Sequence, residues 1–338
     1  MSVFGNSKIA DKEYGMIKIC GTGSALPTKR VTNDDLAQIM DTSDEWISSR
    51  TGIRARHLAV EETTSGLSVD AAKQALTEAG IQADELDLII AATLSPDHVL
   101  PTLACEVQAA LSASHAVAFD LHAACSGFLF ALNTAAVYLQ SGVYKNALII
   151  GAETLSKMMD WTDRGTCVLF GDGAGAAVIR EIPDGTDRGL RSFVQYSDGS
   201  RGGVLSCGGR PLVNPYTAHE TEHPYVEMDG QAVYKFAVGT VPHVVAEAVE
   251  QAGVSIADIG HFVLHQANSR IIASVAKRLG QPLDKFPMNL QECGNISAAS
   301  VPILLDYLNK NDMIKENEYI VLAGFGAGLT WGAAVIKW

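Results

Sequence analysis

Three residues have side chains that could act together in nucleophilic chemistry: Cys125, His265 and Asn295. Cys125 follows the apolar segment AVAFDL and is the first residue of CSGFLFALNTAAVYLQ, a pattern that predicts a strand followed by a long helix. A thiol at the start of a helix lies beside unpaired backbone N–H groups and the positive end of the helix dipole, and both stabilise a thiolate. We therefore expect the pKa of Cys125 to lie one or more units below the usual value of about 8.5. Taken alone, its position also fits a small buried core residue.

The other two residues also follow predicted strands or precede predicted helices. His265 ends the apolar segment HFVLH, and Asn268 is the predicted cap of the next helix. Asn295 lies in ECGNISAAS, where Gly294 permits a close approach of the chain and Ser297 can cap the apolar helix that follows. Taken singly, a structural histidine and a turn asparagine explain them equally well. Together with Cys125 they favour a functional site, because ligands of α/β proteins collect beyond the carboxyl ends of strands.

Short apolar runs alternate with amphipathic segments along the chain, and this alternation predicts an α/β fold whose sheets are covered by helices. The predicted buried strands are LDLIIAAT from residue 86, AVAFDL from 116, NALIIGAE from 146, HFVLH from 261 and EYIVLAGFG from 318. The predicted helices are 68–79, 126–140, 232–252 and 268–279.

An internal repeat divides the sequence into two related parts. The segment EAGIQADELDLIIAAT (78–93) resembles QAGVSIADIGHFVLHQ (251–266), and FGDGAGAAVIR resembles FGAGLTWGAAVIK, with GAAVI shared from Gly175 and Gly332. Both offsets are about half the chain, which favours a duplicated fold over an array of small repeats. Chance similarity between two β-rich segments is the alternative. Because the three polar residues are not duplicated, we expect the function to be asymmetric.

Length and composition limit the class of protein. The 338 residues carry no dividing linker, which predicts one large unit or two intimately packed halves. Hydrophobic residues make up 47% and no apolar run is long enough to span a membrane, so we expect a globular protein that does not enter a membrane. The first residues have no secretion signal, which favours the cytoplasm. Six scattered cysteines without a CxxC pair argue against a zinc ribbon or a disulfide framework, and the net charge of −13 opposes nucleic-acid binding.

The segments DLHAACSGF, FVLHQAN and CGNISAAS, in this order and spacing, closely resemble the β-ketoacyl-acyl carrier protein synthase III family of the thiolase superfamily. Residues 43–57 and 163–178 and the closing GFGAGLTWGAAVIKW also match, so the resemblance covers residues 16–338. It implies a duplicated, thiolase-like α/β fold of five layers (αβαβα) and a homodimer. We accordingly divide the chain into an extension (1–15), an N-terminal half with the nucleophile (16–184) and a C-terminal half (185–338).

The resemblance also implies a reaction and assigns residues to it. Cys125 would take an acyl group from acyl-CoA, and the backbone N–H groups of Cys125 and Ala327 would form the oxyanion hole. His265 and Asn295 would stabilise the enolate that forms when malonyl-acyl carrier protein loses CO₂. The product is a β-ketoacyl carrier protein, which initiates fatty acid synthesis; a related ketosynthase of secondary metabolism is the alternative. No metal or organic cofactor is implied, since the CoA thioester is a substrate.

Trp46 and Arg50 are spaced i, i+4 and should share one helix face. By resemblance, Trp46 and Arg164 sandwich the adenine of CoA, with Arg50 nearby on the nucleotide. A tryptophan in a surface network of salt bridges is the structural alternative.

A basic helix face follows His265 in the sequence. Arg270 and Lys277 are spaced i, i+7, with Arg278 beside them and Lys235 expected nearby. By resemblance, such a patch recruits the acidic acyl carrier protein. A solvated helix face is the alternative.

The acyl group is the part of the substrate that the sequence leaves open. Leu100 stands where the family often has phenylalanine, in a position that lines the acyl pocket of the partner subunit. His122 and Ser126 also flank Cys125 unusually. We take acetyl-CoA as the expected primer, with longer or branched acyl groups as alternatives.

Two other classes of enzyme share some of these residues. The segment HETEH (219–223) matches the HExxH pattern of zinc proteases, but Pro224 and polar neighbours oppose the required helix, so we predict a polar loop. A cysteine, a histidine and an asparagine also serve papain-like hydrolases, but the sequence around Cys125 lacks the papain signature and the half-chain repeat has no place there. A carrier-binding relative without activity is disfavoured because all three polar residues are present.

Overall fold

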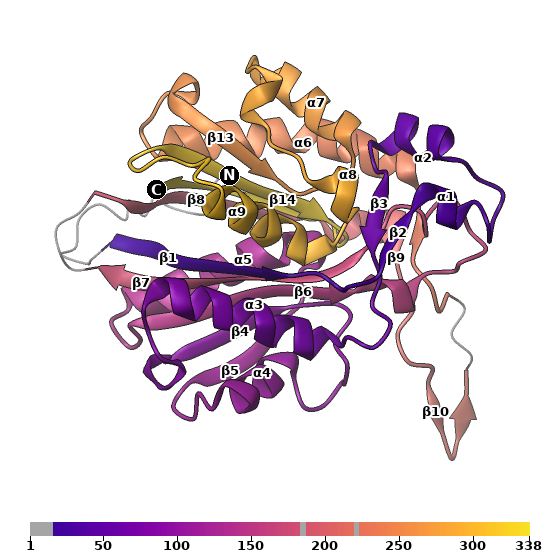
Figure 1. Ribbon diagram of the computed structural model, residues 1–338, viewed down its shortest axis with the longest axis horizontal. Coiled ribbons are helices and arrows are strands. Elements are labelled where there is room, and N and C mark those ends of the chain that lie inside the picture. Colours follow the sequence, from indigo (N-terminus) through magenta and orange to yellow (C-terminus); the bar gives the residue numbers. More distant parts are fainter. Residues whose placement is uncertain (1–15, 183–186, 220–222) are drawn as a thin grey trace.

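Two β-sheets form the centre of the protein in a computed structural model that describes residues 16–182, 187–219 and 223–338 (Figure 1). The first sheet has the strand order β1 (Met16–Ala25), β7 (Asp172–Ile182), β6 (Asn146–Thr154), β4 (Leu88–Ala92) and β5 (Val117–Leu121). The second has the order β13 (Ile259–Leu264), β14 (Tyr319–Gly326), β15 (Thr330–Lys337) and β8 (Gly189–Ser197). In the first sheet, β1 pairs antiparallel with β7 and β7 with β6, whereas β4 pairs parallel with β5 and β6. In the second sheet, β15 pairs antiparallel with β14 and β8, whereas β13 pairs parallel with β14.

Helices separate and cover the two sheets, which gives the five-layered αβαβα arrangement that the family resemblance implies (Figure 1). The central layer consists of α5 (Gly127–Gln140) and α9 (Ser300–Lys310), whose apolar side chains share one buried cluster with strands of both sheets. The outer face of the first sheet packs against α3 (Thr64–Ala79) and α4 (Leu103–Leu111). The outer face of the second packs against α6 (Gly230–Gln251) and α7 (Ser269–Leu279).

All five strands and all four helices predicted from periodicity occur close to their predicted bounds. The predicted burial of AVAFDL is wrong, because β5 is an edge strand whose Val117 is exposed and whose other residues are half-buried. The strand β4 shows why the apolar runs were informative: each of its five residues is fully buried, because helices cover both faces of the sheet. Shorter elements lie around this centre: β2 (Arg30–Thr32), α1 (Asn33–Leu36), α2 (Asp44–Thr51), β3 (Ala55–His57), α8 (Leu290–Cys293), β9 (Leu205–Ser206), β10 (Val213–Asn214), β11 (Thr217–Ala218) and β12 (Glu227–Met228).

The internal repeat of the sequence corresponds to a repeat in the topology. The order β1-β7-β6-β4 of the first sheet matches β8-β15-β14-β13 of the second. The similar segments 78–93 and 251–266 each contain a helix end, a short 3₁₀ turn and a parallel strand, which is β4 in one case and β13 in the other. The predicted boundary at residue 184 and the extension 1–15 lie outside the described residues.

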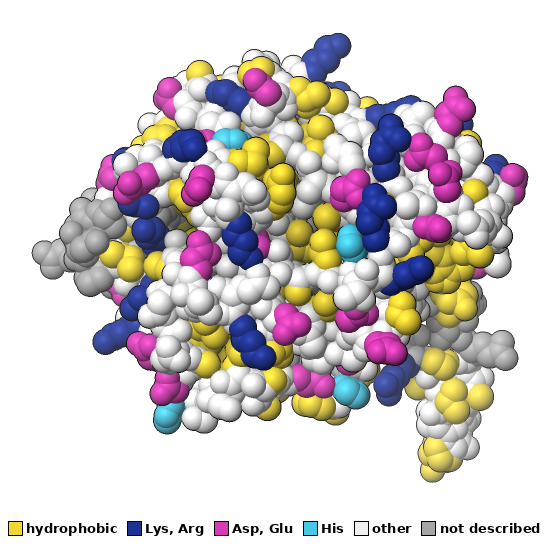
Figure 2. Space-filling model, viewed as in Figure 1, with side chains coloured by type: hydrophobic (Ala, Val, Ile, Leu, Met, Phe, Trp, Pro, Cys, Tyr) yellow, Lys and Arg dark blue, Asp and Glu magenta, His cyan; other side chains and the backbone are white. Residues whose placement is uncertain are grey.

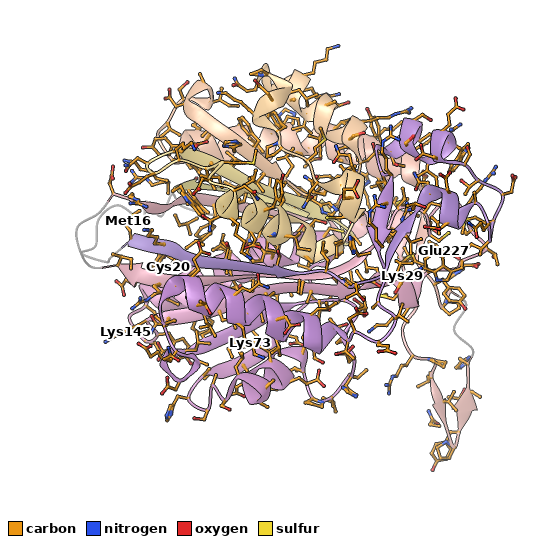
Figure 3. The ribbon with its side chains drawn as sticks, in the orientation of Figure 1. Met16, Cys20, Lys29, Lys73, Lys145 and Glu227 are labelled. Atoms are coloured by element: carbon orange, nitrogen blue, oxygen red, sulfur yellow. The ribbon has the colours of Figure 1, made fainter. Side chains whose placement is uncertain are left out.

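Figure 2 shows acidic and basic side chains interspersed over one face. Figure 3 labels Cys20 on β1 and Lys73 on α3, both in the first half of the chain.

All six cysteines are free thiols. Within the described ranges, no helix combines the length and the hydropathy needed to cross a bilayer.

Candidate active site

Cys125 lies in a short 3₁₀ turn, η3 (Ala124–Ser126), directly before α5. The end of β14 packs against it so closely that a Cβ atom built on Gly326 would lie 2.8 Å from the Cys125 Cβ and 3.2 Å from its Sγ. Only a glycine fits this contact without displacing a neighbour. The position at a helix start was therefore predicted correctly, and the neighbour that fixes the thiol comes from the other half of the chain.

The thiol of Cys125 is not acidified, which contradicts the expectation from the sequence. Its burial raises the pKa to about 12, and the charge of Glu153 also raises it; the Ser297 hydroxyl and the Cys125 backbone lower it only partly. Removal from water penalises the thiolate more than the helix start stabilises it. At neutral pH the resting thiol is therefore protonated, and its reaction as a nucleophile requires a proton acceptor.

His265 directly follows β13 and is held from both sides. Its backbone N–H donates to the Ala323 carbonyl at 2.8 Å, and its ring stands edge-on to Phe325 with the ring centres 5.2 Å apart. Burial lowers the pKa of His265 to about 3, so the imidazole is neutral at pH 7. Its Nδ1 is enclosed and has no hydrogen-bond partner within the described part of the chain, which leaves Nε2 as the atom that can meet a ligand.

Asn295 is oriented by its own neighbours in the chain. Its backbone N–H donates to the Leu169 carbonyl at 2.8 Å, and its carbonyl accepts the Gly171 N–H at 3.0 Å. The side-chain Oδ1 accepts the Ser297 N–H at 2.9 Å. Since the amide oxygen is occupied in this way, the amide NH₂ group is the part of the side chain left to donate to a ligand.

Gly294 and Ser297 were both singled out in the sequence, with different outcomes. Gly294 has a φ of +67° and lies against the Leu169 carbonyl, so the predicted close approach is confirmed. The predicted capping role of Ser297 is wrong: α9 begins after Ala299, and the Ser300 hydroxyl accepts the Ile296 N–H. The Ser297 hydroxyl instead faces Cys125 and Glu153 and lowers the pKa of both groups.

The contacts above bring the three polar residues to the carboxyl end of β14. Cys125 touches Gly326, and the His265 ring stands against Phe325, the preceding residue. Asn295 reaches the same place through Ser297, whose hydroxyl faces the thiol. The expectation that strand ends would gather these residues agrees with these contacts.

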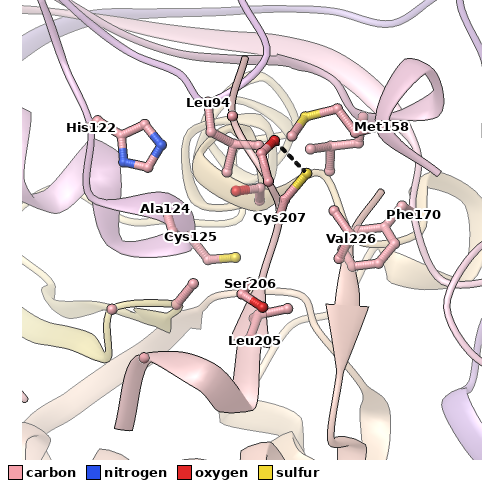
Figure 4. Close-up of a pocket in the computed structure, with 17 residues that line it drawn as sticks. Leu94, His122, Ala124, Cys125, Met158, Phe170, Leu205, Ser206, Cys207 and Val226 are labelled. Carbon is pink, nitrogen blue, oxygen red and sulfur yellow. Dashed lines mark hydrogen bonds between the residues drawn. The ribbon is translucent and has the colours of Figure 1, made fainter. Parts of the chain in front are cut away.

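Cys125 opens into a cavity of about 460 Å³ that also contains Ser297 and Ala327 (Figure 4). Most of the remaining lining is apolar: Leu94, Leu155, Met158, Phe170, Leu205 and Val226, with His122, Ser206 and Cys207. Apart from His122, this lining was missed from the sequence because it comes from several distant loops. The signal that could have found part of it is the apolar residue directly after a strand, as with Leu155 after β6.

A second cavity of about 1080 Å³ lies between α2 and the start of α6. Trp46, Arg50, Lys235 and Arg270 line it, which joins residues predicted for CoA with residues predicted for the carrier protein. The guanidinium carbons of Arg50 and Arg164 lie 4.7 and 5.0 Å from the centre of the Trp46 ring. The predicted shared face of Trp46 and Arg50 thus exists, and Arg164 completes the group.

The remaining predicted residues lie away from these cavities. Lys277 and Arg278 are exposed near the end of α7. Leu100 is 82% exposed and does not line the cavity of its own chain.

The described residues contain no group of three or more histidine, cysteine or acidic side chains that could hold a metal ion. The middle of the HETEH segment lies outside those residues. His223 at its end pairs with Glu227, with Nδ1 and Oε1 2.7 Å apart.

Comparisons with known proteins agree with the resemblance of the sequence. The family described as 3-oxoacyl-[acyl-carrier-protein (ACP)] synthase III matches residues 119–199, and its C-terminal counterpart matches residues 249–338. The β-ketoacyl-[acyl-carrier-protein] synthase III of Clostridium acetobutylicum is 48% identical over 323 residues, which cover 95% of this chain and 98% of the relative. This chain belongs to the β-ketoacyl-acyl-carrier-protein synthase III family. It is therefore an enzyme of the acyltransferase class.

Solved structures of synthase III proteins have the same fold. The crystal structure of 3-oxoacyl-[acyl-carrier-protein] synthase III from Aquifex aeolicus VF5 matches with a TM-score of 0.89 at 43% identity, covering 95% of this chain and all of the other. The priming β-ketosynthase from the R1128 polyketide biosynthetic pathway matches with a TM-score of 0.88 at 34% identity, covering 96% of each chain. The five-layered arrangement is thus that of synthase III and its thiolase-like relatives.

Proposed function

We propose that this chain joins a short acyl group from acyl-CoA to a two-carbon unit from malonyl-acyl carrier protein, with release of CO₂ and CoA, and so initiates fatty acid synthesis. One arrangement carries the proposal: Cys125 lines an apolar cavity and packs against Gly326, the neutral His265 ring stands against the preceding Phe325, and Asn295, whose amide NH₂ is left to donate, holds the Ser297 that lines the same cavity. These groups suit a reaction that stores an acyl group and then stabilises an enolate.

In the first half-reaction the Cys125 sulfur attacks the acyl-CoA carbonyl carbon. The oxyanion that develops needs preorganised donors, and we assign the backbone N–H groups of Cys125 and Ala327 to this role. Both residues line the same cavity, which supports the assignment. The apolar side chains around them suit a short hydrocarbon chain on the acyl enzyme.

In the second half-reaction malonyl thioester loses CO₂ and leaves an enolate. We assign the His265 Nε2–H and the Asn295 NH₂ group as donors to the enolate oxygen. Because burial holds His265 neutral, it stabilises the oxygen as a hydrogen-bond donor rather than as a cation. The enolate carbon then attacks the acyl group on Cys125, and the β-ketoacyl thioester leaves.

We propose the second cavity as the site for the nucleotide of CoA. A flat adenine can stack on Trp46 and meet the positive charges of Arg50 and Arg164. Insertion between Trp46 and Arg164 requires Arg164 to leave the ring and loosen its ion pair with Asp41, which are 3.1 Å apart. Both partners are exposed, so the cost is small.

The acyl carrier protein has a proposed landing site beside this cavity. Lys235 and Arg270 line its rim, and Lys277 extends the positive charge along α7. An acidic carrier would be attracted to these groups on a chain whose net charge is −13.

The proposed assembly is a homodimer formed along the edge strand β5. Val117 on this strand is 47% exposed and Leu100 in the loop before α4 is 82% exposed, so both apolar side chains are available to a partner subunit. We assign Leu100 to the acyl cavity of the partner subunit. The scheme requires no metal or organic cofactor, and the proposed compartment is the cytoplasm, where CoA thioesters and carrier protein meet.

Similarity to the R1128 priming β-ketosynthase supports a second candidate, priming of a polyketide chain. The chemistry on Cys125 is the same in both cases, and the acyl group differs. Rates measured with acyl-CoA substrates of increasing length and with one malonyl carrier separate the two candidates.

The test of the proposed function begins with acyl transfer. Incubation with acetyl-CoA, without added metal, should add one acetyl group to Cys125, as located by mass spectrometry of peptides. Malonyl-acyl carrier protein should then remove it as a β-ketoacyl product. Cys125→Ala should abolish both steps, whereas Cys105→Ala, a half-buried cysteine on α4, should leave them intact. Peptide cleavage that depends on Cys125, with no acyl enzyme formed, would favour a hydrolase instead.

A further inference from the structure

A buried carboxyl group lies beneath the active site and has no role in the scheme above. Glu153 on β6 is fully buried, and its Oε2 accepts hydrogen bonds from the Leu94 N–H at 3.1 Å, the Ser95 hydroxyl at 2.5 Å and the Thr93 hydroxyl at 3.4 Å. Its Oε1 is enclosed and makes no hydrogen bond of ordinary length and angle in the described ranges, although the Ser297 hydroxyl and the Ala298 N–H lie near enough to lower the pKa of the carboxyl group. A buried carboxyl oxygen without a partner is costly, so its presence calls for an explanation.

The Ser297 hydroxyl is buried and lowers the pKa of both Glu153 and Cys125, so it lies near both groups. Ser297 also lines the same cavity as Cys125. The hydroxyl makes no hydrogen bond of ordinary length and angle to a described residue. The φ of Ser297 is +44°, a region that non-glycine residues rarely occupy. Residues held in such conformations cluster at functional sites.

Close backbone packing fixes the relative positions of these groups. A Cβ atom on Gly151, two residues before Glu153, would lie 2.3 Å from the Ala298 carbonyl oxygen. The strand β6 and the turn η8 (Ser297–Ala299) are therefore in direct backbone contact. This contact fixes the backbone positions from which the Glu153 carboxyl group and the Ser297 hydroxyl extend.

We propose that Ser297 relays the thiol proton of Cys125 to the Glu153 carboxylate while the acyl group is loaded, and that Glu153 returns it when condensation frees the thiol. The proposal rests on the acyl transfer proposed above. It assigns Glu153 as the proton acceptor that the protonated thiol requires.

The steps balance as follows. As the Cys125 sulfur bonds to the acyl carbon, its proton passes to the Ser297 oxygen while the Ser297 proton passes to Glu153. The C–S bond to CoA then breaks, and CoA leaves as a thiolate that takes a proton from water. After decarboxylation, the enolate carbon bonds to the acyl carbon and the C–S bond to Cys125 breaks. Glu153 then returns its proton through Ser297 to the Cys125 sulfur, so the cycle consumes one proton from solvent.

The charges around the relay suit this exchange. Burial raises the pKa of Glu153 to about 7, so the carboxyl group can be charged or neutral near neutral pH. Among the described residues, Glu153 is coupled to the charge of Lys157 and to the thiolate form of Cys125, which is neutral at rest. Transfer that accompanies C–S bond formation avoids a free thiolate, which burial disfavours. The acyl enzyme then contains a neutral thioester and a neutral acid, and no buried charge without a partner.

The replacement Glu153→Gln distinguishes a relay from an electrostatic or structural role by the sign of its effect. The glutamine amide has the same shape and keeps an oxygen for the three donors, but it cannot accept the proton. If Glu153 acted only through its charge, its removal would lower the pKa of Cys125 and make the thiol more reactive. The relay predicts a less reactive thiol.

The experiment measures Cys125 in the full chain with two probes: alkylation by iodoacetamide between pH 6 and 9, and single-turnover acetylation by acetyl-CoA. In the unchanged chain both rates should rise with pH as Glu153 loses its proton near pH 7. Glu153→Gln and Ser297→Ala should each slow both reactions at least about tenfold and remove this step, since general-base catalysis contributes roughly 10²–10⁴-fold. The double variant should be no slower than the slower single variant.

Ser192→Ala is the matched control, because it removes a buried hydroxyl that donates to the Ala248 carbonyl at 2.6 Å, far from the site. It should leave both rates unchanged. Equal or faster alkylation in Glu153→Gln overturns the relay, as does an additive loss in the double variant. If Glu153→Gln does not fold, the pH profile of Ser297→Ala decides the question: loss of the step near pH 7 supports the relay, and a slower rate that keeps this step overturns it, since Ser297 would then act only by lowering the pKa of Cys125. If the unchanged chain is alkylated but never acetylated by acetyl-CoA, the proposed function is refuted. If the unchanged chain condenses normally and the Glu153 and Ser297 variants react at the same rates, only the relay is refuted.

Discussion

The contact between Gly326 and Cys125 leads to a sharp prediction for Gly326→Ala. The added methyl group would lie 2.8 Å from the Cys125 Cβ and 2.9 Å from its backbone N, whereas ordinary contacts begin at 3.4 Å. The thiol or the end of β14 must therefore retreat by about 0.6 Å. A misplacement of about 1 Å costs on the order of 10²-fold in rate, so we expect kcat/KM to fall about 10- to 100-fold. Overpacking should also lower the free energy of unfolding by about 1–3 kcal/mol.

The assay compares steady-state condensation and urea unfolding of this variant with those of Gly239→Ala. Gly239 lies within α6, and a Cβ atom there would meet nothing within 4 Å. Alanine should leave the activity unchanged and raise the unfolding free energy by about 0.5–1 kcal/mol, the usual gain for glycine to alanine in a helix. Full activity in Gly326→Ala would refute the reasoning, because the thiol would then tolerate a displacement that the structure does not allow.

Further predictions concern pH, the enolate and CoA. The pKa of His265 falls from 6.5 to about 3 on folding, so the unfolded chain binds more protons below pH 6.5 and the free energy of unfolding decreases as the pH falls. His265→Asn removes this effect. Between pH 7 and pH 5, its free energy of unfolding in urea should therefore decrease by about 2 kcal/mol less than that of the unchanged chain. Asn295→Asp keeps an acceptor for the Ser297 N–H but lacks the amide donor. This variant should form acetyl enzyme at the normal rate, and its condensation rate should fall about 10²–10³-fold. Acetyl enzyme should then accumulate, as measured by mass spectrometry, whereas normal turnover would contradict the assigned role of Asn295. Trp46→Ala should raise KM for acetyl-CoA about tenfold with little change in kcat, since cation–π and stacking contacts contribute about 1–2 kcal/mol; an unchanged KM would place the nucleotide elsewhere.

The sequence predicted the fold because its signals were local. Strands buried between helical layers appear as continuous apolar runs, so β4, β6 and β14 could be located within a few residues. The half-chain repeat predicted a duplication that recurs in the strand order of both sheets. The division at residue 184 stays a prediction, because it lies outside the described residues.

Properties that depend on burial could not be predicted in the same way. The pKa of Cys125 was expected to fall because its helix start is visible in the sequence, but the desolvation that raises it comes from packing between both halves. Ser297 looked like a helix cap for the same reason, since a serine before an apolar run is the usual signal. Glu153 could not be recognised at all, because a single glutamate at the end of an apolar strand carries no pattern.

The duplicated fold also explains how a symmetric scaffold supports asymmetric chemistry. The central helices α5 and α9 are each preceded by a 3₁₀ turn whose first residue has nearly the same strained conformation, with φ of +45° at Ala124 and +44° at Ser297. In this correspondence Cys125 matches Ala298, and the methyl side chain of Ala124 matches the hydroxyl of Ser297. Each turn therefore supplies what the other lacks, a thiol from one half and a hydroxyl from the other. Because the two turns come together where both central helices begin, the repeated geometry concentrates the reactive groups at one place, while their chemistry differs between the halves.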